Sequence, residues 1–206
     1  MASPTPLRRK PVQQRSTKRV EQMLEACAAL IEEVGYDGVT TTLIAERAGV
    51  AVGSLYQFFP DKRAVVRELT RRNLEHFLKV VGERFETTYV DHWWDAVDLA
   101  IDIYVDMHRT IPGFSKLHFG DVVDLELLDD GEGKHNNEVV SGRLTEIVAS
   151  KAGLPVEELI LPITIAVEAT DGIHKLAFRR DPSGDQTIID EGKYLLRQYL
   201  SSKVGK

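Results

Sequence analysis

Apolar residues recur at spacings of three and four along most of this chain, which is the periodicity of helices that bury one face. The first such stripe runs over residues 16–34, and Gly35 ends it. The stripe consists of Val20, Leu24, Cys27, Leu30, Ile31 and Val34. No stretch alternates with the period of two that favours a strand. The pattern predicts an all-α protein of about nine helices.

The segments after the first helix are short and closely spaced. Thr40 is a candidate N-cap for a helix over residues 41–48. Gly49 ends that helix, and another short helix is predicted over residues 52–58, followed by a long helix over residues 61–86. A long helix, a short helix, a glycine turn and a second short helix are typical of a helix-turn-helix motif.

Five further helices are predicted beyond residue 86. They cover residues 93–109, 114–128, 136–152, 156–180 and 186–204. The helix over residues 156–180 is apolar around most of its circumference. The last helix carries two adjoining apolar stripes, Ile188, Leu195 and Tyr199 beside Ile189, Leu196 and Leu200. This excess of apolar surface predicts a homodimer built on the last two helices, and burial wholly within one subunit is the alternative.

The chain has 206 residues, 43% of them hydrophobic, which is enough to form one or two ordinary cores. Its apolar runs fall short of the roughly 20 residues needed to cross a bilayer, so no membrane span is expected. The N-terminus lacks the apolar core of a signal peptide. We therefore expect a cytoplasmic protein.

The net charge of −6 conceals a difference between the two ends of the chain. Residues 1–80 carry 13 Lys and Arg against 9 Asp and Glu, whereas residues 81–206 carry 13 against 23. Six basic residues precede the first acidic one: Arg8, Arg9, Lys10, Arg15, Lys18 and Arg19. We expect residues 1–15 to form a flexible basic arm that approaches nucleic acid, with a merely solvated tail as the alternative.

One set of residues resembles the N-terminal signature of the tetracycline-repressor (TetR) family. The set comprises Gly35, Tyr36, Thr40, Ile44, Ala45, Ala48, Gly49, Val50, Gly53, Leu55, Tyr56, Phe59 and Lys62. The resemblance implies a three-helix DNA-binding head over residues 16–62, and a ligand-binding and dimerisation domain over residues 63–206. It also implies a regulator, expected to be a repressor, that binds palindromic operator DNA as a homodimer and is released by a small effector. From the residues of the second domain we expect this effector to be largely apolar.

Nine residues of the head are predicted to meet DNA: Thr40, Thr42, Ala51, Val52, Gly53, Ser54, Tyr56, Gln57 and Lys62. Gln57 can bond adenine through two hydrogen bonds, Ser54 can bond several bases, and Val52 can touch a thymine methyl. Tyr56 and Lys62 are expected to bind phosphate. Many members of the family have Ser where this chain has Ala51, so a side-chain cap is expected to be missing there.

Aromatic and polar groups recur on otherwise apolar helices of the second domain, as in small-molecule sites. The candidate effector-binding residues are Trp94, Tyr104, His108, Phe114, His118, Phe119, Glu168, Asp171 and His174. Ordinary core aromatics and solvated charges are the alternative interpretation of each.

Other functions find less support in the sequence. The chain lacks a nucleophile elbow, a glycine-rich phosphate loop and a paired-histidine zinc helix, so we expect no enzyme and no cofactor. His118 with Asp121 and Asp124 leaves a metal sensor as an alternative, and an architectural DNA-binding protein without effector is another. The single cysteine, Cys27, is expected to be a buried small hydrophobe rather than a reactive thiol.

Overall fold

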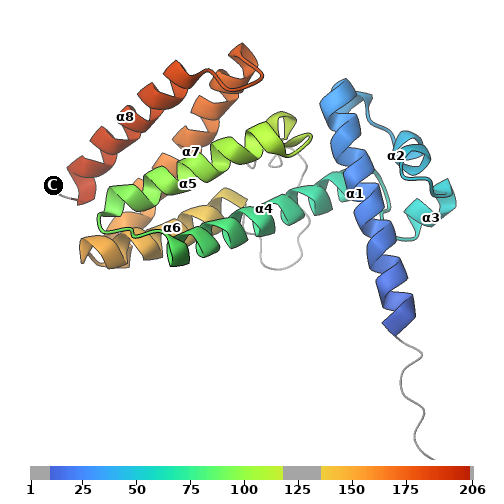
Figure 1. Cartoon of the computed structure of the whole chain (residues 1–206), viewed down its shortest axis with the longest axis horizontal. Coiled ribbons are helices and arrows are strands. Elements are labelled where there is room, and N and C mark those ends of the chain that lie inside the picture. The colour runs from blue at the N-terminus through green and yellow to red at the C-terminus, as the bar shows by residue number, and fades with distance from the viewer. Residues whose placement is uncertain (1–9, 118–135, 205–206) are drawn as a thin grey trace, which may run out of the picture. The chain divides into compact units, whose positions relative to one another are not determined.

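The computed structural model describes residues 10–117 and 136–204, and within these ranges every regular element is a helix (Figure 1). The predicted all-α fold is confirmed. The chain divides into two compact units, Met1–Leu69 and Thr70–Lys206. The division falls inside the long helix α4 (Lys62–Thr87), whereas the sequence places it after Lys62. None of the helices in the described ranges is long and apolar enough to cross a membrane.

The first unit consists of α1 (Lys10–Gly38), α2 (Thr41–Arg47), α3 (Val52–Tyr56) and the beginning of α4. Its core is apolar, and its most deeply buried members come from all four helices. They are Met23, Leu24, Cys27, Ile31, Ile44, Ala45, Leu55, Val65, Val66 and Leu69. Cys27 is fully buried, as the sequence predicts.

Helix α1 differs from the prediction at both ends. It begins at Lys10, so residues 10–15, assigned to the arm, are helical; Pro11 is compatible with a first helical turn. Near the other end the backbone leaves the helical conformation at Gly35, with φ 71° and ψ 167°. Val34, predicted to be buried, is 53% exposed. It lies in the last turn before this kink, where fewer neighbouring residues cover a helix.

Local caps define the short helices. Thr40 has extended backbone angles, and its Oγ1 accepts a hydrogen bond from the Leu43 N–H at 3.2 Å, as predicted for an N-cap. After α2, Gly49 has a φ of 66°, and the Val50 N–H donates to the carbonyl of Ala45 at 3.0 Å. This is the hydrogen bond of a Schellman turn, which ends a helix and redirects the chain. The turn delivers the chain to α3.

The second unit contains the rest of α4 with five further elements. They are α5 (Trp93–Thr110), the 3₁₀ helix η1 (Phe114–Lys116), α6 (Asn136–Ala152), α7 (Val156–Arg180) and α8 (Gln186–Val204). Helix α7 contacts both α6 and α8, and α5 contacts α6, η1 and α8. The predicted bounds of α6, α7 and α8 agree with the structure. Of the helix predicted over residues 114–128, only η1 and Leu117 lie within the described residues.

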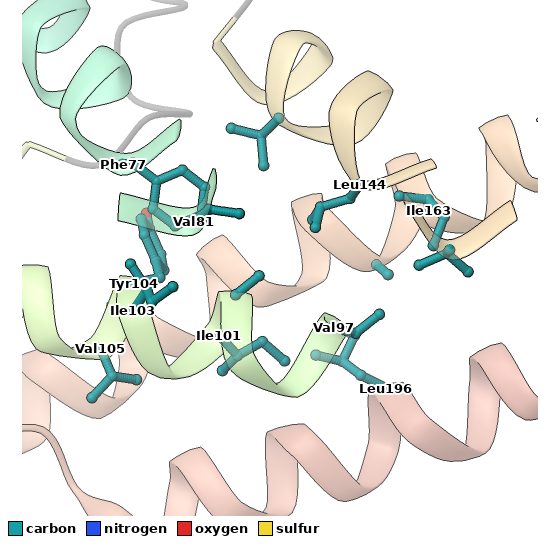
Figure 2. Packing of buried hydrophobic residues seen from close by; sticks show 14 of the residues in the cluster. Phe77, Val81, Val97, Ile101, Ile103, Tyr104, Val105, Leu144, Ile163 and Leu196 are labelled. Atoms are coloured by element: carbon teal, nitrogen blue, oxygen red, sulfur yellow. The ribbon is translucent and has the colours of Figure 1, made fainter. Parts of the chain in front are cut away.

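One apolar cluster joins the helices of the second unit. Figure 2 shows part of it, with Phe77 of α4 close to Tyr104 of α5, their ring centroids 6.0 Å apart. Polar contacts add to this packing: Lys193 of α8 donates to Asp98 of α5 at 2.9 Å and also contacts Asp102. Burial of Lys193 lowers its pKa, but the hydrogen bonds to Asp102 and Asp98 outweigh that effect, so the pKa is raised.

Candidate functional site

Helix α3 has one buried side and one open side. Leu55 is fully buried and fixes α3 to the core of the first unit. Val52, Gly53 and Gln57 are exposed, and Tyr56 is 52% exposed. The predicted base-reading residues therefore lie on a surface that a DNA groove can approach, with the exception of the Ser54 hydroxyl.

The hydroxyl group of Ser54 is not exposed, although the predicted reading of bases would require it to be. Its Oγ is buried and has no hydrogen-bond partner among the described residues. Ser54 lies in a hollow that Arg19 and Gln22 of α1 share with Gln57 of α3. In this conformation the hydroxyl is not accessible to a base edge. Arg19 stands instead beside the beginning of α3 and adds positive charge there.

The threonines at the start of α2 have three different roles. Thr40 caps the helix, Thr42 is exposed in its first turn, and the hydroxyl of Thr41 lies 3.0 Å from that of Tyr56. This last contact links α2 to α3 and orients the Tyr56 hydroxyl, which the sequence assigned to phosphate. Thr41 was not among the predicted residues, because its partner lies fifteen positions away in another helix. Ala51, at the N-cap of α3, makes no side-chain cap, as expected.

Lys62 binds the end of α1 in this structure. Its Nζ donates to the carbonyl oxygen of Tyr36 at 3.0 Å and lies 4.2 Å from the centroid of the Tyr36 ring. A cation at the end of a helix satisfies a terminal carbonyl and favours the helix dipole. An ammonium group has three donors, so this contact leaves donors for a phosphate.

An ion pair between two helices of the first unit was also not predicted. Arg47 of α2 donates two parallel hydrogen bonds to Glu33 of α1, at 2.8 and 2.7 Å. The hydrogen bond from Arg47 holds the pKa of the Glu33 carboxyl below its usual range. The pair fixes α2 against α1, while exposure to solvent limits its contribution to stability.

The second unit contains a narrow, partly open cavity of about 50 Å³ between α4, α5, α6, α7 and α8. Most of its wall is apolar. The apolar wall includes Phe77, Val97, Ile101, Leu144, Ile163 and Leu200. The volume accommodates a few water molecules, whereas sites for small organic ligands usually measure roughly 300–1,000 Å³.

Four polar residues line this cavity: Tyr104, Asn137, Thr170 and Asp171. The Tyr104 hydroxyl donates to Asp171 Oδ1 at 2.7 Å, and Lys175 Nζ lies 3.2 Å from the other carboxylate oxygen. Tyr104 and Asp171 were predicted for the effector site. Asn137 and Thr170 were not, because neither the first turn of α6 nor the residue before Asp171 showed that it would face a cavity.

Three other predicted residues pack around Tyr104 without lining the cavity. The ring centroids of His108, Phe114 and His174 lie 4.4, 5.5 and 5.2 Å from that of Tyr104. His108 Nδ1 contacts the carbonyl oxygen of Tyr104 at 2.8 Å, and His174 Nδ1 that of Thr170 at 2.7 Å. They hold the Tyr104 ring in place rather than offering groups to a ligand in the cavity.

The remaining residues predicted for the effector site do not line this cavity or lie outside the described residues. Trp94 is buried, but it does not line the cavity; the Arg197 guanidinium lies 5.8 Å from its ring centroid. Glu168 is exposed, because the helical rotation from Val167 turns it away from the cavity side of α7. His118 and Phe119 lie outside the described residues, as do Asp121 and Asp124 of the alternative metal site. The residues that are described contain no cluster able to hold a metal ion.

The two apolar stripes of α8 face in different directions. Ile189, Leu196 and Leu200 are buried, whereas Leu195 is 56% exposed. Ile188 and Tyr199 are half-buried. Helix α7 likewise leaves large apolar side chains exposed, namely Ile160, Leu161, Ile165 and Leu176. The last two helices therefore keep apolar surface that their own unit does not cover.

Both units match known protein families. Residues 23–69 match the family described as bacterial regulatory proteins, tetR family, and residues 91–204 match the tetracyclin repressor-like C-terminal domain. A crystal structure of a TetR-family transcriptional regulator from Streptomyces coelicolor is 38% identical, covering 90% of this chain and 99% of that one, with a TM-score of 0.76.

Curated relatives match over shorter stretches. An HTH-type transcriptional regulator of Mycobacterium bovis is 40% identical over 75 residues, which is 34% of this chain and 38% of that protein. The HTH-type transcriptional repressor KstR of Rhodococcus jostii is 42% identical over 59 residues, 26% of this chain and 28% of KstR. The chain thus spans well under two thirds of the length of these curated relatives. The match to the C-terminal domain family extends over more than half of the chain, and the Streptomyces coelicolor regulator aligns with 90% of it. This protein therefore belongs to the tetracycline-repressor (TetR) family of bacterial regulatory proteins.

Proposed function

We propose that this protein is a transcriptional regulator that binds operator DNA through α2 and α3. The observation that carries the proposal is the two-sided character of α3. Leu55 is fully buried, while Val52, Gly53 and Gln57 remain exposed. A helix held rigidly by its inner side and presenting short and polar residues outward is suited to the major groove.

Base reading rests on Gln57 and Val52. Gln57 can form two hydrogen bonds with adenine, and Val52 can contact the methyl group of thymine. Thr42 and Tyr56 bind phosphates, with Tyr56 oriented by its contact with Thr41. Thr40 and Gly53 permit close approach of the backbone at the start of each short helix.

The test selects binding sites from a random DNA pool and measures affinity for the selected site by fluorescence anisotropy. Gln57→Ala is expected to cost roughly 1 to 3 kcal/mol at the selected site and to relax the preference at one base pair. Thr88→Ala, exposed beyond the end of α4, serves as the control and leaves affinity unchanged. A Gln57→Ala variant that weakens binding to every DNA equally contradicts the assignment of α3 as the reading helix.

We also propose that the protein is a homodimer formed by α7 and α8. Leu161 and Leu195 are 67% and 56% exposed, and an uncovered apolar surface of this kind is typical of a subunit interface. A two-fold axis through these helices pairs two heads, so the operator is expected to contain two half-sites in palindromic arrangement.

Sedimentation velocity at micromolar concentration tests the dimer. Leu195→Glu buries a carboxylate in the proposed interface and is expected to give a folded monomer with an unchanged circular dichroism spectrum. Arg197→Glu places the same carboxylate on the other side of α8 and remains dimeric. A wild-type protein that sediments as a monomer removes both the dimer and the two-half-site operator.

The effector is proposed to bind in the cavity lined by Tyr104, Asn137 and Asp171. An apolar cavity with a few polar groups supports this function over that of an architectural DNA-binding protein, which needs no cavity. An effector that prefers the DNA-free conformation lowers operator affinity by about 5- to 150-fold, the usual range of an allosteric pair. Operator titrations with and without candidate ligands measure this factor. An operator affinity that no ligand changes favours the architectural protein.

A further inference from the structure

The cavity of the second unit contains an unused hydrogen-bond donor. Asn137 is 5% exposed and lines the cavity, and its Nδ2 atom has no hydrogen-bond partner among the described residues. Buried amide groups in native proteins are nearly always paired, because an unpaired donor loses its hydration without compensation. The donor at Asn137 is therefore a position that a ligand oxygen can satisfy.

The other polar groups of the cavity wall are engaged within the protein. Thr170 Oγ1 donates to the carbonyl oxygen of Ala166 at 2.7 Å. The Tyr104 hydroxyl donates to Asp171, whose second oxygen pairs with Lys175. A ligand that used these groups would first have to break existing bonds. Asn137 thus offers the polar contact that costs least to make.

The charge of the wall selects against anions. Among the lining residues that the structure describes, Asp171 is the charged one, and there is no Lys, Arg or His among them. A carboxylate or phosphate in this cavity would lose its hydration near Asp171 without gaining a cation. An ammonium group would have to compete with Lys175 for the carboxylate. The remaining surface is aliphatic and aromatic.

We propose that the effector is an uncharged, mostly apolar molecule with one oxygen, such as a ketone or ester carbonyl, that accepts a hydrogen bond from Asn137 Nδ2. This inference rests on the proposed function for its consequence on DNA, whereas binding itself is measured without DNA. Since the cavity is about 50 Å³, the molecule must widen it on binding.

Four ten-carbon probes separate the possible chemistries: 2-decanone, decane, decanoate and decylamine. Binding to the full-length, DNA-free protein is followed by the fluorescence of the two tryptophans, since both are buried within one turn of Val97, a residue of the cavity wall. The expected order is 2-decanone first and decane about tenfold weaker. The two ions are expected to be weaker still.

Asn137→Leu, which keeps the number and branching of the side-chain heavy atoms and removes the amide, is expected to abolish the preference for 2-decanone over decane. The same variant is expected to raise the melting temperature of the ligand-free protein, because it removes a buried unpaired donor. Thr145→Val is the matched control. Thr145 is buried on the same helix, does not line the cavity and donates to the carbonyl oxygen of Ser141, so its variant keeps the ketone preference.

Three binding results overturn the inference: tighter binding of decanoate or decylamine than of 2-decanone, an unchanged ketone preference in Asn137→Leu, or binding of none of the probes up to its solubility limit. A lower melting temperature of Asn137→Leu also overturns it, because Nδ2 would then have a partner in the protein. Failure of the proposed function is a separate result, since a protein without specific DNA binding can still prefer 2-decanone.

Discussion

Replacing Gly192 with alanine tests how closely α7 and α8 pack. A Cβ atom at Gly192 would lie 2.6 Å from Ile173 Cγ2 and 3.3 Å from Ile173 Cδ1. The Cγ2 methyl is attached directly to a branched Cβ and has little freedom to withdraw. The two helices must therefore separate slightly, or Ile173 must leave its rotamer.

The magnitude follows from two opposing effects. Overpacking of this kind costs typically about 1–3 kcal/mol, whereas alanine is about 0.8–1.0 kcal/mol better than glycine inside a helix. Gly192→Ala is thus expected to lower the free energy of unfolding by about 1 kcal/mol. In an Ile173→Ala background the obstacle is absent, so the same change is expected to raise it by about 1 kcal/mol.

Urea denaturation of the four proteins of this cycle measures the sign change. Because the proposed dimer would add a concentration-dependent contribution to stability, each curve is recorded at several protein concentrations. Gly142→Ala on α6 is the control, since an added Cβ there meets nothing within 4 Å, and it is expected to stabilise both backgrounds equally. A stabilising Gly192→Ala in the wild-type background would refute the close α7–α8 contact.

Three further predictions concern polar contacts. The hydrogen bond with Arg47 lowers the pKa of Glu33 in the folded protein, so the ionised carboxylate stabilises the fold. This contribution is fully present above the unfolded pKa of about 4.3 and disappears as the pH falls through the lower folded pKa. Urea denaturation curves of Glu33→Gln should therefore lack that part of the dependence of stability on acid pH. Tyr104→Phe removes a buried hydrogen bond to the Asp171 carboxylate and should lower the free energy of unfolding by about 1.5–3 kcal/mol, measured by the same method. We propose that Lys62 contacts a phosphate in addition to Tyr36, so Lys62→Ala should weaken binding to all DNA sequences together and flatten the salt slope by about one unit. Unchanged affinity on every sequence would contradict the phosphate contact.

The sequence predicted the helices well because their boundaries depend on local chemistry. The Thr40 cap and the glycine turn at Gly49 act within a few residues of the chain. The same holds for Gly35, where the backbone leaves the helical conformation at the predicted end of the first helix. Such signals are visible in a short window of sequence, so the order of the elements follows from them, whereas the length of α1, which begins at Lys10, does not.

The candidate sites were harder to predict because they depend on contacts between distant segments. Glu168 and Asp171 are both acidic residues of α7, yet Asp171 lines the cavity and Glu168 is exposed. Only the rotation of α7 against its neighbours distinguishes them. The sequence pattern indicated no role for Asn137, and for Lys62 it predicted a phosphate contact but not the contact with Tyr36 that the structure shows.

The small volume of the cavity bears on how an effector could act at all. A ligand shifts the balance between two conformations only by the difference in its affinity for them, so a site equally open in both would bind without effect on DNA. A cavity of about 50 Å³, lined by Phe77, Leu144 and Ile163, cannot accept a ten-carbon molecule without displacing these side chains. The widened conformation is then the one that the ligand selects, and the cost of widening reduces the apparent affinity.

A variant that widens the cavity beforehand, such as Leu144→Ala, is therefore expected to bind 2-decanone more tightly and to bind operator DNA more weakly without any ligand. If Leu144→Ala binds the ketone more tightly but keeps full operator affinity, widening of the cavity is not the change that releases DNA.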